Sequence, residues 1–271
     1  SQGQHAWRAP GTGQLVSMRT GNGKLVAKNT GVTVVSDFCS ADLAAGGRGA
    51  PLAPLLHQEL FYTDREDRAV VNIGGIASLT LLPARGGVSG FDCGPGICLM
   101  DVWTMRHLQK TRDVAGSWAA KGKVCKQLLQ SMLQDPYFDS MLPASTGPEY
   151  FNITWLDNFL AEHALDATDV QTTLAELTVI SIARCLASGP LPKRLLVCGG
   201  GAHNTHLLGR LAAALPQAVV DTTNRYGADP DWVEGLLFAW LAHERLAGRV
   251  QDTTTITGAS HPSLLGRIFE P

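Results

Sequence analysis

The sequence predicts an α/β protein, and two observations support this prediction. Short runs of β-branched and aliphatic residues alternate along the chain with longer segments of helical periodicity. Glycine accounts for 29 of the 271 residues and clusters after several of the apolar runs, where it lets the backbone turn tightly or approach a ligand closely. Strands that end in glycine turns and lead into helices are typical of this class.

Four short strands are expected in the first half of the chain. The run VTVV at 32–35 indicates a buried strand that leads into a glycine loop. RAVVNIGG at 68–75 indicates a strand that ends in a Gly-Gly turn, and ASLTLL at 77–82 should return antiparallel to it. VSGFD at 88–92 is the fourth strand, and we expect Asp92 to lie at its end.

The second half is predicted to be largely helical. Thr168 and Gln171 have the spacing of a capping box, which would open a helix that runs to about Ser188. KRLLVCGGG at 193–201 indicates a strand that enters a triple-glycine turn, and Asn204 is a suitable N-cap for the helix that follows. In the last long helix, we expect Asp229 as the cap, Pro230 at the first position and Gly248 at the end.

The length of the chain allows one large core or two smaller ones. Prolines interrupt the helical periodicity between residues 105 and 150. We therefore place a boundary between two lobes in this region and expect domains at 1–115 and 116–271.

Charge and composition narrow the classes of partner. The formal net charge is −2 and the isoelectric point is near 6.4, so we expect no nucleic-acid partner and no membrane-surface partner. No run of 18 apolar residues and no signal-peptide core is found, so no transmembrane helix is expected. Six cysteines without a CxxC pair indicate reduced thiols in a cytoplasmic protein, and the eight histidines show no metal-ligand spacing.

Two strands end in glycine turns, one at 70–75 and one at 195–201. Bare backbone amides at such turns can hold a phosphate, or let a flat base lie against the chain. Neither turn matches the P-loop or the dinucleotide fingerprint, and each taken alone is more often only a turn. The pair nevertheless fits a nucleotide held in a cleft between two lobes.

Three acids are candidates for chemistry. Asp92 offers a general base, a metal ligand or an Asx turn, and its place after a strand favours a ligand site. Asp42 can accept hydrogen bonds from sugar hydroxyls, or it can cap a short turn. Glu234 lies in the first turn of its helix, where the helix dipole favours a carboxylate for structural reasons alone.

Several segments, taken in order, resemble the anhydro-N-acetylmuramic acid kinase family. They are GVTVVSDFCSADLAAGGRGAPLAPLLHQELF, VVNIGGIASLTLL, GFDCGPGICLMDVW, STGPEYFN, LLVCGGGAHN, DPDWVEGLLFAWLA and TGASHPSLLGRI. The resemblance implies a two-lobed sugar kinase/actin-like fold with ATP in the cleft. It also implies cleavage of the 1,6-anhydro ring and phosphorylation of the 6-oxygen in peptidoglycan recycling, and a homodimer is plausible.

The resemblance also implies roles for particular residues. Asp92 matches the general base, and Asp42 and Glu234 match positions near the sugar. Magnesium would accompany ATP, with ligands that the resemblance does not assign. The catalytic acid and the sugar-binding loop would lie in the 1–115 lobe, and the adenosine turn in the 116–271 lobe. The nucleotide-binding positions would be Gly74 and Gly75 at the second phosphate loop and Gly199, Gly200, Gly201 and Asn204 at the adenosine segment.

This chain also departs from the family pattern. The glycine-rich GTSxDG loop that opens the family chain is not in the sequence, so we expect an incomplete N-terminal lobe. Cations that are usual in the family are replaced in this chain, and so are the residues beside the catalytic acid. The loss of the cations would weaken the binding of anionic substrates. A truncated or degenerate relative that binds sugar or a partner without phosphoryl transfer is therefore the alternative. The altered positions are Cys39, Ala41, Cys93, Ile97, Ala144 and Pro148.

Overall fold

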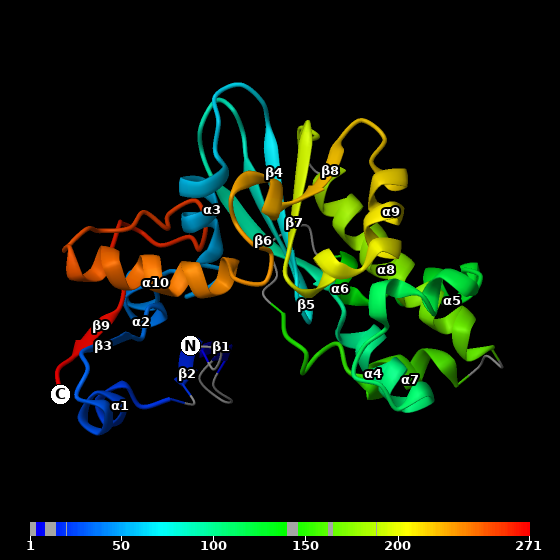
Figure 1. The fold of residues 1–271 in the computed structure, drawn as a ribbon, viewed down its shortest axis with the longest axis horizontal. Helices are drawn as coiled ribbons and strands as arrows, with labels where there is room; N and C mark the ends of the chain where they lie inside the picture. The colour runs from blue at the N-terminus through cyan, green and yellow to red at the C-terminus, as the bar shows by residue number, and fades with distance from the viewer. Residues whose placement is uncertain (1–3, 9–14, 20, 140–145, 162–164, 188) are drawn as a thin grey trace. The chain divides into compact units, whose positions relative to one another are not determined.

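The computed structural model describes residues 4–8, 15–19, 21–139, 146–161, 165–187 and 189–271 (Figure 1). Helices and strands are interspersed along the chain, so the predicted α/β class is confirmed. The chain divides into two compact units. The first is Ser1–Glu59, Gly87–Gly90 and Glu234–Pro271, and the second is Leu60–Gly86 and Phe91–Val233. These units do not follow the predicted division at residue 115, because strands from both sides of that residue pair in one sheet.

The first unit combines two small antiparallel pairs with short helices. Strand β1 (Gln4–Arg8) pairs with β2 (Leu15–Arg19), and β3 (Val34–Ser36) pairs with β9 (Arg267–Phe269). The expected strand at 32–35 is thus found at 34–36. The helices that begin or lie in this unit are α1 (Gly23–Thr30), α2 (Cys39–Ala44), α3 (Ala53–Phe61) and, after its first residue, α10 (Val233–Leu246).

A five-stranded mixed sheet forms the centre of the second unit, in the order β6-β5-β4-β7-β8. The hairpin of β4 with β5 is antiparallel, as predicted, whereas β7 lies parallel to β4 and β8 lies parallel to β7. Parallel pairing brings the carboxyl ends of β4 and β7 to the same edge of the sheet. The strands are β4 (Arg68–Ile73), β5 (Ile76–Leu82), β6 (Ser89–Pro95), β7 (Arg194–Cys198) and β8 (Val219–Thr222).

Helices of the second unit pack on one face of this sheet (Figure 1). Alternate residues of the strands, such as Val71 of β4 and Val197 of β7, join one hydrophobic cluster with them. The helical elements are α4 (Cys98–Leu108), η1 (Val114–Gly116), η2 (Ala119–Lys121), α5 (Lys126–Met132), α6 (Pro136–Asp139), α7 (Ile153–Leu160), α8 (Ala167–Ala187), η3 (Gly200–His203), α9 (Thr205–Ala214) and η4 (Thr223–Tyr226).

Helix α8 is long and apolar enough to cross a membrane by length and composition. However, 67% of its most apolar window is buried inside the protein. Its buried side chains, among them Leu174 and Leu177, belong to the core cluster beneath the sheet. The composition of α8 is therefore explained by its place in a domain core.

The capping box predicted for α8 is wrong. The helix begins at Ala167, and Asp166 accepts a hydrogen bond from the amide of Thr168 through Oδ1 at 2.7 Å. The side chain of Thr168 instead accepts from Trp118, and buried Gln171 donates to Thr104. Tertiary partners thus take up both side chains that the local pattern assigned to the cap.

The predicted start of α10 is also wrong, because the helix begins at Val233. Asp229 accepts from the amide of Asp231, and its carbonyl accepts from Trp232, so these residues form a turn before the helix. The carbonyl of Pro230 accepts from the amide of Gly199. That bond fixes Pro230 outside the helix and beside the glycine turn after β7.

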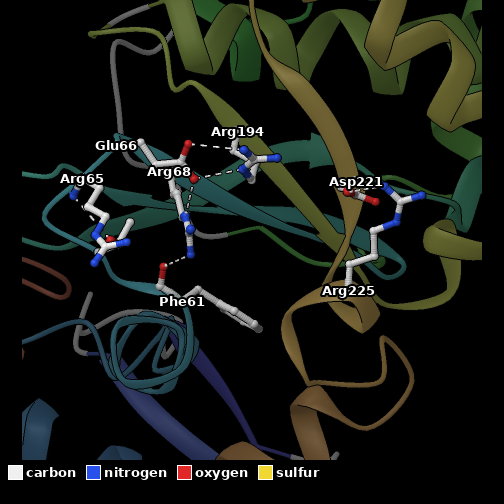
Figure 2. Close-up of polar contacts among 8 residues, drawn as sticks. Phe61, Arg65, Glu66, Arg68, Arg194, Asp221 and Arg225 are labelled. Atoms are coloured by element: carbon white, nitrogen blue, oxygen red, sulfur yellow. Dashed lines mark hydrogen bonds and ion pairs between the residues drawn. The ribbon is translucent and has the colours of Figure 1, made fainter.

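Ion pairs stabilise the amino-terminal edge of the sheet (Figure 2). The carboxylate of Glu66 accepts from Arg68 at 2.8 Å and from Arg194 at 2.9 Å, where β4 and β7 begin. Both guanidinium groups lie over the ring of Tyr226, at 5.2 Å and 5.8 Å from its centroid. The hydrogen bond from Arg194, and then that from Arg68, lower the pKa of Glu66. Both bonds tie together the starts of the two strands whose other ends carry the glycine turns.

Candidate nucleotide-binding and catalytic site

Three glycine segments meet at the carboxyl edge of the sheet in the second unit. Gly74 and Gly75 follow β4, the turn at 199–201 follows β7, and Gly96 precedes α4. The amide of Gly96 donates to the carbonyl of Gly75, and the amide of Ile97 donates to that of Gly74, each at 2.8 Å. The two predicted nucleotide-binding turns are thus brought to one edge, together with the segment that follows Asp92.

The glycines of the turn after β7 are required by packing. Gly199 has φ 76°, and a Cβ on it would overlap Oδ1 of Asn72. A Cβ on Gly201 would overlap the side chain of Ile73. These glycines let η3 lie directly against the end of β4.

The turn after β4 is less crowded. A Cβ on Gly74 would come no closer than 3.7 Å to a neighbouring atom, and one on Gly75 no closer than 3.6 Å. Packing against the residues that the structure describes therefore gives no reason for glycine at these two positions. The amide of Gly74 already donates to the carbonyl of Ile76 at 3.2 Å, which limits what this residue can offer a phosphate.

A cavity of about 330 Å³ lies beside these segments. Its walls mix apolar side chains with several polar groups, and its size is within the range of small-molecule sites. It includes Gly200 and Asn204 from the predicted adenosine segment. The lining residues are Ile97, Met100, Asp101, Arg112, Asp113, Val114, Ala115, Gly200, His203, Asn204 and Asp231.

Asn204 serves α9 as the sequence predicted, because its side chain accepts a hydrogen bond from the amide of Leu207 at 3.0 Å. It is buried, and a Cβ on Gly116 would overlap its Oδ1. Its side-chain oxygen is thus committed to the helix. A contribution to nucleotide binding would come from the position of Asn204 on the cavity wall.

The sequence reasoning missed the loop 112–116, which supplies another wall of the cavity. Ala115 and Gly116 both have left-handed backbone, with φ 56° and 69°. The hydroxyl of Thr205 donates to the carbonyl of Ala115 at 3.1 Å, and Asp113 accepts from the amides of Trp118 and Ala119. Gly116 is the only residue of this loop whose type indicates a turn in the sequence. No local motif links the loop to the glycine turn at 199–201, which lies far along the chain.

Asp101 is a second residue that the sequence reasoning did not place in a site. It lies in the first turn of α4 and lines the cavity with Arg112 and Asp113. Burial raises its pKa to about 6, the charge of Arg112 opposes this rise, and that of Asp113 adds to it. A carboxyl group with a raised pKa beside a cavity is a candidate for proton transfer.

His203 and Asp231 form a side-chain hydrogen bond on the cavity wall, at 2.7 Å between Nε2 and Oδ1. Both side chains are more than half exposed. The contact joins η3 to the turn before α10 and therefore helps to shape the cavity.

Asp92 lies within β6 rather than at its end, because the strand continues to Pro95. The residue is half-buried, and its Oδ2 accepts from the amide of Thr146 at 3.0 Å. Tyr137 donates its hydroxyl to the carbonyl of Asp92 at 3.2 Å. Burial, and then the nearby charge of Asp92, raise the pKa of Tyr137, so the phenol remains a donor at neutral pH.

Asp42 lies in the first unit and is fully buried. Its Oδ1 accepts from the hydroxyls of Thr253 and Thr257, at 2.5 Å and 2.6 Å, and its Oδ2 accepts from the amide of Gly49 at 2.7 Å. The carboxylate thus organises the glycine loop after α2.

Glu234 is the other predicted sugar-binding acid, and it is exposed in the first turn of α10. Among the described residues, no group of three or more histidines, cysteines or acids could hold a metal ion. Of the altered family positions, Ala144 lies outside the described residues.

Sequence comparison connects this arrangement to known proteins. A family model described as anhydro-N-acetylmuramic acid kinase matches residues 1–271. A protein of that name from Xanthomonas axonopodis pv. citri (strain 306) is 47% identical over 270 residues, which cover 99% of this chain and 72% of the relative. Another, from Pseudomonas syringae pv. tomato (strain ATCC BAA-871 / DC3000), is 46% identical over 271 residues and is covered to 74%.

Solved structures show only distant similarity. A gluconate kinase from Lactobacillus acidophilus aligns with a TM-score of 0.43 at 12% identity, over 81% of this chain and 45% of that chain. A xylulose kinase from Rhodospirillum rubrum aligns with a TM-score of 0.41 at 13% identity, over 69% and 41% respectively.

Proposed function

Because this chain belongs to the anhydro-N-acetylmuramic acid kinase family and is therefore a phosphotransferase, we propose the specific reaction that this family name describes. The substrate is anhydro-N-acetylmuramic acid, whose 1,6-anhydro ring is opened by water. The 6-oxygen that is released takes the γ-phosphoryl group of ATP. The products are N-acetylmuramic acid 6-phosphate and ADP, and the reaction belongs to peptidoglycan recycling.

The carboxyl edge of the sheet is where we propose that the nucleotide binds. Two arguments support this: the glycine turns after β4 and β7 share one edge, and a cavity of about 330 Å³ lies beside the second turn. Gly200 and Asn204 would line the adenosine side, and the Gly74–Gly75 turn would lie nearer the phosphates. Among the described residues, no neighbour explains the bare backbone at Gly75, which is open to a ligand.

Asp92 is proposed as the general base. The amide of Thr146 donates to one carboxylate oxygen, and an ionised carboxylate is a proton acceptor of the kind that general-base catalysis uses. It would take a proton from water while the water oxygen attacks the anomeric carbon. The bond from that carbon to the bridging oxygen breaks, and the bridging oxygen becomes the phosphoryl acceptor.

We propose different roles for Asp42 and Glu234. Asp42 would act on the sugar as a positioning residue, because its oxygens already accept from Thr253, Thr257 and Gly49. Exposed Glu234 can make direct contact with a polar ligand.

Magnesium is expected with ATP, and it would neutralise charge on the transferred phosphoryl group. The described side chains offer no three-ligand cluster. A magnesium ion held mainly by phosphates and water, with one or two carboxylates, fits such a chain. We assign no ligand to it.

The observation that carries the proposal is the family match over the whole chain. The test is release of ADP from MgATP, with and without the anhydro sugar, alongside calorimetric binding of the sugar. We expect sugar-dependent ADP release. Sugar binding without turnover at saturating MgATP would favour the alternative, a relative that binds without transferring phosphate. We also propose that the protein acts in the cytoplasm. A homodimer remains a prediction from the family resemblance.

A further inference from the structure

Asp101 has no role in the reaction proposed above, yet it lines the cavity at the carboxyl edge of the sheet. It lies in the first turn of α4 and is half-buried. Its carboxyl group accepts no hydrogen bond from another residue that the structure describes, although the charges of Arg112 and Asp113 act on it. The cavity therefore presents a carboxyl group whose oxygens are open to the hydrogen-bond donors of a ligand.

Other polar side chains on the cavity wall already have partners within the protein. Asp113 accepts from two backbone amides, each at 2.9 Å. Asp231 is bonded to His203 at 2.7 Å, and Asn204 accepts from an amide of α9 at 3.0 Å. Asp101 differs from these residues, because its side chain adds nothing to the hydrogen bonding of the described fold.

The backbone places Asp101 one helical turn from a residue that touches both glycine turns. The amide of Ile97 donates to the carbonyl of Gly74 at 2.8 Å, and its Cδ1 lies 3.0 Å from where a Cβ on Gly200 would be. The amide of Asp101 donates to the carbonyl of Ile97 at 2.8 Å, which corresponds to a rise of about 5.4 Å along α4. With the phosphates beside Gly74, the part of a nucleotide that follows them at this distance is the ribose.

The charge of the cavity wall favours the same part of the nucleotide. Among the described residues that line it are three carboxylates and one guanidinium, that of Arg112. Because like charges repel, this wall disfavours phosphate groups. A ribose is uncharged, and its two hydroxyls are donors that the two oxygens of one carboxylate can accept.

We propose that Asp101 recognises the ribose of the nucleotide by accepting hydrogen bonds from its 2′- and 3′-hydroxyls, and that it makes the site selective for ribonucleotides. The inference rests on the proposed function, because it takes the nucleotide to bind at this edge. An acid accepts from a ribose hydroxyl in the same way in dinucleotide-binding folds. Burial raises the pKa of Asp101 to about 6, so the group is ionised at neutral pH and the hydrogen bonds are charge-assisted.

The test is calorimetric titration of the full chain with MgADP and with the magnesium complex of 2′,3′-dideoxyADP, at about pH 7.5. The unaltered chain should bind ADP about tenfold or more tightly than the dideoxy form, because the latter lacks hydrogen bonds to a charged group. Asp101→Ala should bind ADP as weakly as it binds dideoxyADP. Equal binding of the two nucleotides by the unaltered chain, or a preference that persists in Asp101→Ala, would overturn the proposal.

Two further variants separate ribose recognition from other effects. Asp101→Asn keeps the shape of the side chain with one acceptor oxygen and no charge, so it should fold and lose most of the preference for ADP. Asp231→Asn changes a cavity acid that is bonded to His203, and it should alter the affinity for both nucleotides by the same factor. Loss of the preference in Asp231→Asn but not in Asp101→Asn would contradict the assignment.

The titration also distinguishes failure of this inference from failure of the proposed function. A chain that binds both nucleotides with equal affinity contradicts the ribose contact and leaves the proposed function standing. A chain that binds neither contradicts both.

Discussion

Asp42 is a fully buried carboxylate that accepts three hydrogen bonds, from Thr253, Thr257 and Gly49. Hydrogen bonds to charged groups contribute about 1.5–3 kcal/mol each, and a lost partner leaves buried donors unsatisfied. The acid is therefore first a structural residue of the first unit. A role toward the sugar would be exerted through the glycine loop that it holds.

This difference between Asp42 and Glu234 can be measured. Asp42→Ala should lower the free energy of unfolding by about 3 kcal/mol or more, because three donors lose a charged acceptor. Glu234→Ala, the matched control on an exposed surface, should stay within about 0.5 kcal/mol. Urea denaturation followed by tryptophan fluorescence measures both. Equal effects would show that the hydrogen bonds around Asp42 contribute little.

Asp101 gives a prediction about pH. Its folded pKa, about 6, lies above its ordinary value of 3.8, so the folded state binds the extra proton. Stability from this group is therefore present below pH 3.8 and is lost as the pH rises toward 6. Asp101→Asn should gain stability relative to the unaltered chain across this window, with exposed Asp64→Asn as the control. A difference that stays constant between pH 4 and 7 would contradict the raised pKa.

At the scale of elements, the turn after β7 connects packing with the site. Gly201 lies against Ile73 so closely that a Cβ would overlap it. Gly209 differs from it, because Gly209 is exposed within α9 and no described atom lies within 4 Å of its Cβ position. The two positions therefore separate tight packing from simple helix propensity.

Alanine substitutions at these glycines should have opposite signs. Gly201→Ala should destabilise the protein by about 1–3 kcal/mol through overpacking, and it should weaken ATP binding as the turn shifts. Gly209→Ala should stabilise it by up to about 1 kcal/mol, because alanine favours a helix interior. Thermal unfolding and nucleotide titration measure both effects. Stabilisation by Gly201→Ala would mean that the turn is looser than the structure shows.

Local chemistry explains which elements could be predicted from the sequence. The β4–β5 hairpin, the strand before the triple glycine and the Asn204 cap depend on residues that are close in sequence. The starts of α8 and α10 were misplaced because Asp166 and the turn at Asp229 set them, while distant partners bind residues of the predicted caps. Trp118 takes the Thr168 hydroxyl, and Gly199 takes the Pro230 carbonyl.

The residues of the candidate site also divide into those that the local sequence predicts and those that it does not. The glycine turns could be predicted because each follows an apolar strand, and parallel pairing of β4 with β7 brings them together. The loop 112–116 and Asp101 could not, since neither has a local motif that links it to η3. Their role arises only when α4, the loop 112–116 and η3 form walls of one cavity.

At the scale of the whole molecule, the chain belongs to a family of kinases, and its second unit contains both the glycine-lined edge and Asp92. The central claim is that Asp92 is the general base of the proposed reaction. An oriented carboxylate in this role is worth about 10²–10⁴ in rate. The amide of Thr146, which donates to the carboxylate, can equally serve an asparagine oxygen.

The most direct measurement compares sugar-dependent ADP release by the unaltered chain, Asp92→Asn and the exposed control Asp64→Asn, all with saturating MgATP. We predict turnover in the unaltered chain and in Asp64→Asn, and a loss of about 10²-fold or more in Asp92→Asn with ATP binding retained. Turnover in Asp92→Asn equal to that of the unaltered chain would contradict the claim.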